Sequence, residues 1–370
     1  MSEAFLLISY GAPECETDVV PFLDRLLGGG GSEVYTQATL KFPKLNTQAQ
    51  QCEAVVQGRS LPPIPASVYK QKAAAKYYEF AKRNGKFSPL NEQCRELLDG
   101  IRAEFGKYSL PTNVYHGNLY WHPFLEDTIS QMAADGVTFA KCFITSAFDS
   151  TAGNRRYSYA IGSARQKIGN TAPLIQRLPL PFDQPLFIEA QTERLCEAID
   201  GQKNSRQNNE TLIFFTAHSI PQNDPFAGNY VKQLDFVCRA VIEKCCSIYP
   251  ELSDVKWELV YQSQPNAKHK NNDQTTQWLT PSIKNKIITL AEQSKNTQNG
   301  CIANVIISPI GFFCENMETI NDLDFELGDI CESSSIGFSR VLTVGTMPKI
   351  YEMVAQMSIK EHTACSCSVS

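Results

Sequence analysis

The sequence predicts an α/β protein built from two doubly wound, Rossmann-like domains with parallel sheets, and three observations support this. Short apolar runs that end in small or turn-forming residues alternate with helical patterns, as strands and crossover helices do in a parallel sheet. The alternation occurs in both halves of the 370-residue chain, which is long enough for two domains of ordinary size. With 42% hydrophobic and 20% charged residues, the chain can bury a large core.

The first half is predicted to form a domain over residues 1–180. Its predicted strands are 4–13, 112–118, 138–148 and 172–181. Helical patterns lie between them at 124–136 and 157–169. After the first strand, residues 29–66 mix glycine, proline and polar residues over a length that is unusual for a simple connection. Loops of this kind are often lids or binding lips, so we interpret it as a lip insertion.

The second half repeats the rhythm, which predicts a second domain over residues 181–346, joined to the first near 178–185. Its predicted strands are 211–219, 257–265, 303–312 and 339–346, and its helical patterns lie near 186–201, 227–248, 281–295 and 314–331. Residues 347–370 are expected to form a C-terminal helix and a cysteine-containing tail.

Charge and hydropathy exclude several classes of partner. The net charge is -5 and the Lys and Arg residues are scattered, so neither nucleic acid nor anionic lipid is favoured. No stretch approaches the ~20 apolar residues of a membrane span, and the amino terminus lacks a basic region and a cleavage site. We therefore expect a cytoplasmic protein without a transmembrane segment.

Thirteen cysteines are spread from Cys15 to Cys367 without the regular spacing of a disulfide framework. Most are expected to be reduced thiols in the core. The adjacent pair Cys245 and Cys246 and the tail, with Cys365 and Cys367, are exceptions that could bind a metal or a cluster. A four-ligand site would need partners from elsewhere in the chain.

Candidate chemistry lies after two strands of the second half, because ligands of open α/β sheets bind beyond the carboxyl ends of the strands. His218 ends one predicted strand, and Glu318, Asp322 and Glu326 follow another at a spacing of four. Taken singly, a strand-end histidine is more often structural, and an acidic helical face is usually solvated. However, like charges four apart destabilise a helix, so the stripe needs a counter-charge. Together the features favour a site that handles a divalent metal ion.

Seven segments resemble the ferrochelatases, which insert ferrous iron into porphyrins at the end of haem synthesis. In family order they are "LLISYGAPECETDVVPFL", "FSPLNEQCRELL", "VYHGNLYWHPFLEDTISQMAADGV", "FITSAFDSTAGNRRY", "FFTAHSIP", "YQSQP…WLTP" and "ISPIGFFCENMETINDLDFE". They cover most of residues 4–346. The resemblance implies the chelatase fold, with the porphyrin in a cleft between two Rossmann-like domains.

The resemblance also implies roles for individual residues. His218 and Glu318 correspond to the paired metal-site residues, and Asp322 and Glu326 to an acidic ridge that leads away from them. Ser88 and Tyr157 match positions that hold the porphyrin in bacterial members; without the resemblance they would be a turn serine and a packed aromatic residue. Arg155 and its neighbour Arg156 are candidates for binding propionates, the alternative being that both face solvent.

The expected reaction needs these residue types. Two pyrrole protons must leave as the metal enters, and an imidazole can accept a proton near neutral pH. One nitrogen and one oxygen ligand bind Fe²⁺ weakly enough to release it to four ring nitrogens, which a tetrathiolate site would not do so readily. Binding energy from the propionates could favour a puckered ring, which is complementarity to the transition state.

Two positions depart from the family pattern. Glu315-Asn316 stands where many members have Asp-His, so a second histidine is missing. Asn154 occupies a place where related bacterial sequences often have a cysteine that binds an iron–sulfur cluster. We therefore expect no [2Fe–2S] cluster and no cofactor beyond the Fe²⁺ substrate.

The segments look most like bacterial members that act on coproporphyrin III, so we expect that porphyrin and Fe²⁺ as the substrates, with other haem-pathway enzymes as transient protein contacts. Three alternatives stay open: protoporphyrin IX as the porphyrin, a related chelatase for cobalt or nickel, and a non-catalytic porphyrin- or haem-binding protein on the same fold.

Overall fold

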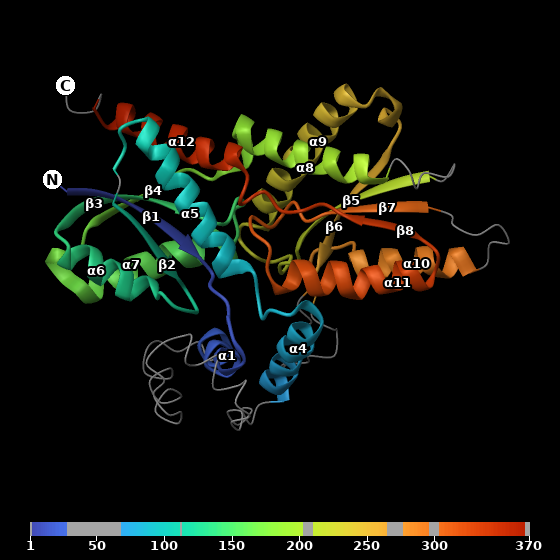
Figure 1. Ribbon diagram of the computed structural model, residues 1–370, viewed down its shortest axis with the longest axis horizontal. Helices are drawn as coiled ribbons and strands as arrows, with labels where there is room; N and C mark the ends of the chain where they lie inside the picture. The colour runs from blue at the N-terminus through green and yellow to red at the C-terminus, as the bar shows by residue number, and fades with distance from the viewer. Residues whose placement is uncertain are drawn as a thin grey trace.

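The computed structural model describes residues 2–27, 68–111, 113–202, 210–264, 277–295 and 303–366. They form two four-stranded sheets in which every strand pairing is parallel, with strand orders β2-β1-β3-β4 and β6-β5-β7-β8 (Figure 1). The prediction of two doubly wound parallel sheets is confirmed. The predicted lip at 29–66 and Cys367 lie outside the described residues.

The first sheet is covered on both faces, as a parallel sheet must be. Its strands are β1 (Ser2–Ser9), β2 (Val114–Asn118), β3 (Val137–Ile144) and β4 (Leu174–Arg177). Phe5 and Leu7 of β1 pack on the side of α5 (Leu90–Lys107), whereas Leu6 and Ile8 pack on the side of α6 (Leu125–Ala134) and α7 (Arg156–Ile168). This alternation is the two-residue period of a strand.

The second sheet follows the same plan. Its strands are β5 (Glu210–His218), β6 (Lys256–Gln262), β7 (Ala303–Ser308) and β8 (Gly337–Arg340). One face packs on α8 (Pro185–Gln202) and α9 (Ala227–Ile248). The other packs on α10 (Ile283–Lys295), on the π-helical segment η6 (Thr319–Leu327) and on α11 (Gly328–Ser333).

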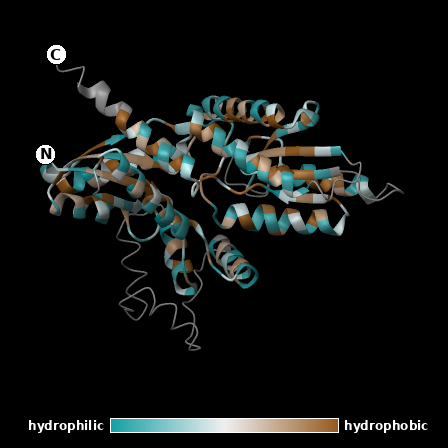
Figure 2. Ribbon diagram, turned by 45° about the horizontal axis from the view of Figure 1, so that its top comes forward, coloured by the Kyte–Doolittle hydropathy of each residue, from teal (hydrophilic) through white to brown (hydrophobic). Residues whose placement is uncertain are grey.

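The two sheets share one apolar core. A single buried cluster includes Phe143 of the first sheet and Phe215 of the second, and Phe313 joins them, with its ring centroid 5.3 Å from that of Phe143. Helix α12 (Pro348–Ser366) returns from the second half to pack on both α5 and α8. In Figure 2 the strands are the most hydrophobic segments, and the helices alternate hydrophobic and hydrophilic residues. The halves are therefore joined by burial as well as by the chain.

A smaller helical layer lies beside the two sheets (Figure 1). It consists of α1 (Val19–Leu27) and α4 (Val68–Asn84), which pack together through Val19, Phe22, Ala74 and Tyr77. Helix α4 was not among the predicted elements. Its exposed faces carry the lysine and arginine residues that matter below.

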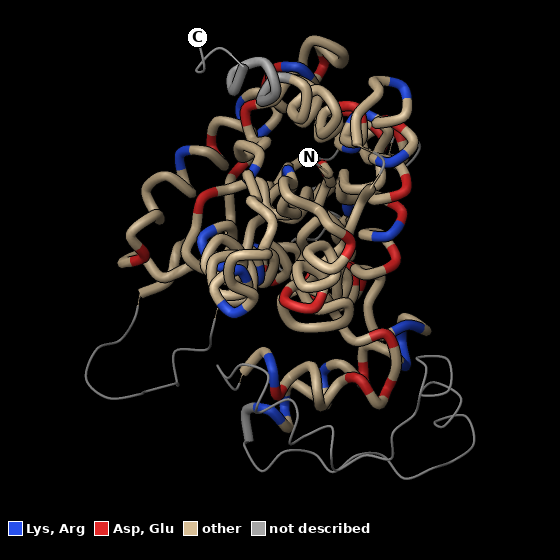
Figure 3. Tube along the Cα trace, turned by 90° about the vertical axis from the view of Figure 1, so that its left-hand side faces the viewer, with Lys and Arg blue, Asp and Glu red and all other residues tan. Residues whose placement is uncertain are grey.

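Figure 3 shows positions of Lys and Arg interspersed with positions of Asp and Glu along the described part of the chain. In that part, none of the helices is long and apolar enough to span a bilayer.

Candidate active site

His218 is the last residue of β5, a central strand of the second sheet. Its Nδ1 lies 2.6 Å from the backbone carbonyl oxygen of Ser219. A carbonyl can only accept, so in the neutral imidazole Nδ1 carries the proton and Nε2 has the lone pair. Nε2 lies 3.9 Å from Glu318 Oε1, and the two side chains are 42% and 39% exposed. The structure thus brings together a free imidazole nitrogen and a carboxylate, both within reach of a ligand.

The loop after β7 brings Glu318 to His218. Gly311 passes so close to β5 that a Cβ at this position would lie 2.4 Å from the Cβ of Ala217. Its backbone N–H donates to the carbonyl oxygen of Thr216 over 3.1 Å. Any larger residue would push the loop away from the strand, so this glycine serves the close approach of two backbones.

Asn316 fixes the start of the helical segment that carries Glu318. Its Oδ1 accepts from the backbone N–H groups of Glu318 at 2.8 Å and Thr319 at 3.1 Å, and Thr319 Oγ1 accepts from the N–H of Asn316 at 3.0 Å. These bonds satisfy N–H groups that a helix start leaves unpaired. Asn316, at the position where the family resemblance implied a histidine, is therefore a helix cap.

Glu315 anchors the same segment to the sheet. Its carboxylate accepts two bonds from Arg340 Nη1, at 2.8 and 2.9 Å, one from the N–H of Thr343 at 2.8 Å and one from Thr319 Oγ1 at 2.7 Å. Burial lowers the pKa of Arg340, but Glu315 and Asp324 raise it by more, so the net shift is upward and the guanidinium stays charged. This buried pair holds the segment against β8.

Glu318, Asp322 and Glu326, called the acidic ridge below, follow one another along this segment. Their counter-charge comes from the protein itself. Lys76 Nζ of α4 lies 2.6 Å from Asp322 Oδ1 and 3.8 Å from Glu326 Oε1, and Lys284 Nζ of α10 lies 3.0 Å from Glu326 Oε2. Partial burial lowers the pKa of Lys76, but Asp322, Glu326 and Glu318 raise it by more. Behind the ridge, Leu323 and Leu327 are buried.

The second oxygen of Asp322 is also bound. Ser263, just after β6, donates from Oγ to Asp322 Oδ2 over 2.9 Å. The φ of Ser263 is +58°, in the left-handed region that residues other than glycine rarely adopt. Backbone strain of this kind is often stored at functional sites. Here it aims a hydroxyl at the middle of the acidic ridge.

Sequence reasoning missed Tyr10, the first residue after β1. Its ring centroid is 4.6 Å from that of Tyr120. Burial raises the pKa of Tyr10, and Tyr120 and Glu318 raise it further, so its hydroxyl stays protonated at neutral pH. The turn after it is pinned by Asn91, whose side-chain amide bonds both the N–H and the carbonyl of Ala12, at 3.1 and 2.8 Å. The strand-end rule could have identified Tyr10 from the sequence. Tyr10 follows β1, which is central in the first sheet as β5, the strand that ends at His218, is central in the second.

The three predicted porphyrin contacts have partners of their own. Ser88 is buried and its Oγ accepts from the N–H of Leu90 over 3.3 Å, at the start of α5. Tyr157 is buried in the cluster between the first sheet and α7. Arg155 forms two bonds with Asp149, at 2.8 and 2.9 Å. Within the described residues, no hydrogen bond or ion pair joins any of the three to His218 or Glu318.

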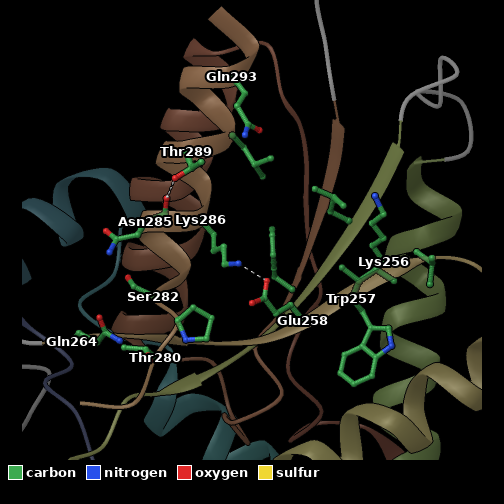
Figure 4. A pocket seen from close by; sticks show the side chains of 16 residues that line it. Lys256, Trp257, Glu258, Gln264, Thr280, Ser282, Asn285, Lys286, Thr289 and Gln293 are labelled. Carbon is green, nitrogen blue, oxygen red and sulfur yellow. Dashed lines mark hydrogen bonds and ion pairs between the residues drawn. The ribbon is translucent and has the colours of Figure 1, made fainter. Parts of the chain in front are cut away.

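A groove of about 1010 Å³ lies elsewhere, between the edge strand β6 and α10 (Figure 4). The Lys286–Glu258 ion pair crosses it, with Nζ and Oε2 2.8 Å apart. Its lining contains no histidine or cysteine, and none of the predicted site residues lines it. The chemistry predicted from the sequence is therefore not located in this groove.

Two parallel α/β sheets and a histidine–carboxylate pair at a strand end are the arrangement that the sequence predicts for a metal chelatase. A family profile described as Ferrochelatase matches residues 2–362. The "Ferrochelatase" of Rhodopirellula baltica is 30% identical over 95% of this chain and 84% of its own length. The "Coproporphyrin III ferrochelatase" of Nocardia farcinica is 31% identical over 97% and 88%.

A solved structure has a similar fold. SirB from Bacillus subtilis with Fe³⁺ has a TM-score of 0.50 and 10% identity, and covers 97% of this chain and 95% of its own. The chain belongs to the ferrochelatase family. It is an enzyme of haem biosynthesis that inserts a metal ion into a porphyrin.

Proposed function

We propose that the chain inserts Fe²⁺ into coproporphyrin III and that His218 and Glu318 carry out the insertion. The supporting observation is the pair itself, with His218 Nε2 3.9 Å from Glu318 Oε1 and Nδ1 held by the carbonyl oxygen of Ser219. An ion about 2.1 Å from each atom fits between them. Two protein ligands leave the remaining coordination positions to water and to the incoming ring nitrogens.

The reaction exchanges two protons for one metal ion. Each pyrrole N–H of the free porphyrin must lose its proton before its nitrogen can bind Fe²⁺. In our proposal the ion first passes from the pair to the two ring nitrogens that carry no proton, which frees Nε2 of His218. Nε2 then accepts one pyrrole proton while Nδ1 keeps its bond to Ser219, so the imidazolium that forms is stabilised by the carbonyl dipole. Glu318 accepts the second pyrrole proton on its carboxylate. Solvent then takes both protons, since the pair is about 40% exposed.

The acidic ridge is proposed as the path of the metal ion to this pair. Asp322 and Glu326 supply carboxylate oxygens, which bind divalent first-row ions without the tight hold of thiolates. The spacing of four places Glu318, Asp322 and Glu326 in succession, so an ion can pass from one carboxylate to the next. Ser263 keeps the middle carboxylate in place.

The porphyrin is proposed to lie against Tyr10 and Tyr120, next to Glu318. Of the two arginines in the loop after β3, Arg156 is the better candidate for a propionate. It donates from Nη1 to Tyr120 Oη over 2.6 Å and has no carboxylate in ion-pair range among the described residues, whereas Arg155 is paired with Asp149. Ser88 and Tyr157 remain proposed as part of the porphyrin pocket wall, as the family resemblance implies.

The porphyrin identity rests on relatives. The proteins of Nocardia farcinica and Frankia alni are both named coproporphyrin III ferrochelatase and are each 31% identical over 96–97% of this chain. Coproporphyrin carries four propionates where protoporphyrin IX carries two, so cationic and hydroxyl donors around the ring favour the former. The nine described cysteines that are free thiols agree with work in a reducing compartment, and we propose the cytoplasm.

An anaerobic assay tests this function. Purified protein, Fe²⁺ and either coproporphyrin III or protoporphyrin IX are mixed, and the loss of free-porphyrin fluorescence gives kcat/KM for each ring. We expect a clear preference for coproporphyrin III. A preference for protoporphyrin IX contradicts the substrate, faster insertion of cobalt or nickel contradicts the metal, and binding without turnover contradicts catalysis.

A further inference from the structure

Lys76 lies on the acidic ridge. It comes from α4, in the first half of the chain, and its Nζ contacts both Asp322 Oδ1 at 2.6 Å and Glu326 Oε1 at 3.8 Å. Figure 1 shows α4 beneath α11, next to the segment that carries the ridge. The ammonium therefore lies between the two carboxylates that a metal ion would reach before Glu318.

A divalent ion and this ammonium compete for the same oxygens. Asp322 has one oxygen on Lys76 and the other on the Ser263 hydroxyl. Glu326 has one oxygen near Lys76 and the other on Lys284. Asn321 Nδ2 also donates to Asp322 Oδ1 at 3.2 Å and to Glu326 Oε1 at 3.1 Å. A metal ion that binds these oxygens must therefore displace a lysine or accept close repulsion from it, and must also replace the neutral amide of Asn321.

We propose that Lys76 is a displaceable counter-ion that sets the affinity of the ridge for divalent cations. In the resting protein it neutralises Asp322 and Glu326, and an arriving Fe²⁺, with twice the charge, replaces it. The ammonium can leave at small cost because its side chain is 39% exposed and ends a flexible four-carbon stem. The inference rests on the proposed function of the ridge as a metal path. It adds that Lys76 keeps monovalent cations from binding to the ridge carboxylates.

Displacement of Lys76 need not detach α4, because other contacts hold this helix. Arg83, two turns further along α4, bonds Asp329 of α11 through two nitrogens, both at 2.6 Å. Its guanidinium also lies 4.1 Å from the ring centroid of Phe325, and the rings of Phe80 and Phe325 are 5.8 Å apart. Arg83 thus provides a matched control on the same helix that does not touch the ridge.

The test is binding of Mn²⁺ without porphyrin, followed by the electron paramagnetic resonance signal of the free ion. Mn²⁺ prefers carboxylates to thiolates, so the thirteen cysteines interfere little. We expect Lys76→Gln to lower the Kd for Mn²⁺ about tenfold, since one repelling unit charge is removed at contact distance. Lys76→Arg keeps the charge and should resemble the wild type. Arg83→Gln removes a surface pair and should also leave the Kd unchanged.

Asp322→Asn separates the two proposals. If Asp322→Asn weakens Mn²⁺ binding while Lys76→Gln leaves it unchanged or weakens it, the counter-ion role of Lys76 is wrong. The proposal that the ridge binds metal ions is then still supported. If Asp322→Asn has no effect, the ridge does not bind metal and both proposals fail. In the insertion assay, the KM for Fe²⁺ should fall in Lys76→Gln with little change in kcat, whereas a purely structural role would lower kcat and the melting temperature.

Discussion

Replacing Glu315 with glutamine removes the charge that balances Arg340 while keeping the size of the side chain. The two side chains are 7% and 9% exposed, so solvent screens the pair little. Breaking a buried pair by removing one partner costs about 3–5 kcal/mol, because the other charge is left buried and unpaired. Arg340 keeps Asp324, whose Oδ1 lies 2.5 Å from Arg340 Nε, so we expect the lower end, about 3 kcal/mol.

Urea unfolding followed by circular dichroism measures this loss at equilibrium. The midpoint should fall in Glu315→Gln with an unchanged slope, since the folded surface area stays the same. The control is Asp329→Asn, which removes the partner of Arg83 at an exposed position and should have little effect. The insertion rate should fall as well, because Glu315 anchors the segment that begins at Glu318. A loss of stability no larger than in the control would refute the buried-anchor reasoning.

Two further substitutions, and one measurement on the unaltered protein, have defined outcomes. Asn316→Ala should cost about 1 kcal/mol through loss of the cap and should lower kcat by displacing Glu318, both measured on the purified variant. Hydrogen bonds from Arg155 lower the pKa of Asp149, so Asp149→Asn should destabilise the protein by about 1 kcal/mol near pH 7. This difference should vanish as the pH falls through the lowered pKa of Asp149, where the wild-type carboxylate also becomes neutral. Because Asn154 replaces a cysteine, anaerobically purified protein should lack stoichiometric sulfide and visible [2Fe–2S] bands.

Strands were predictable because their signal is local. All eight predicted strands are present, and the helix expected near 227–248 has those bounds. The single shared core was not predictable in this way, because periodicity shows which face is buried and not what covers it. Phe313 illustrates this, since it lies in a loop between β7 and η6 and still joins the two sheets.

The strand-end rule selected His218 and the carboxylates, and the structure brings His218 and Glu318 together. It gave no indication of Lys76, which lies 246 residues before Asp322 in the sequence. The missing counter-charge was recognised from the spacing of the acids, but its source depends on the packing of α4, a helix that the apolar pattern did not reveal. Asn316 was likewise noted as a departure, and only the hydrogen bonds identify it as a cap.

The initial rate of anaerobic Fe²⁺ insertion into coproporphyrin III, compared between the wild type and His218→Ala, tests whether the strand-end pair performs the reaction. Lys286→Ala serves as a control, because it breaks the Glu258 ion pair in the groove of Figure 4. We expect His218→Ala to lose at least ~10²-fold of the rate with its fold intact, and the control to keep it. Near-normal turnover by folded His218→Ala would contradict the account.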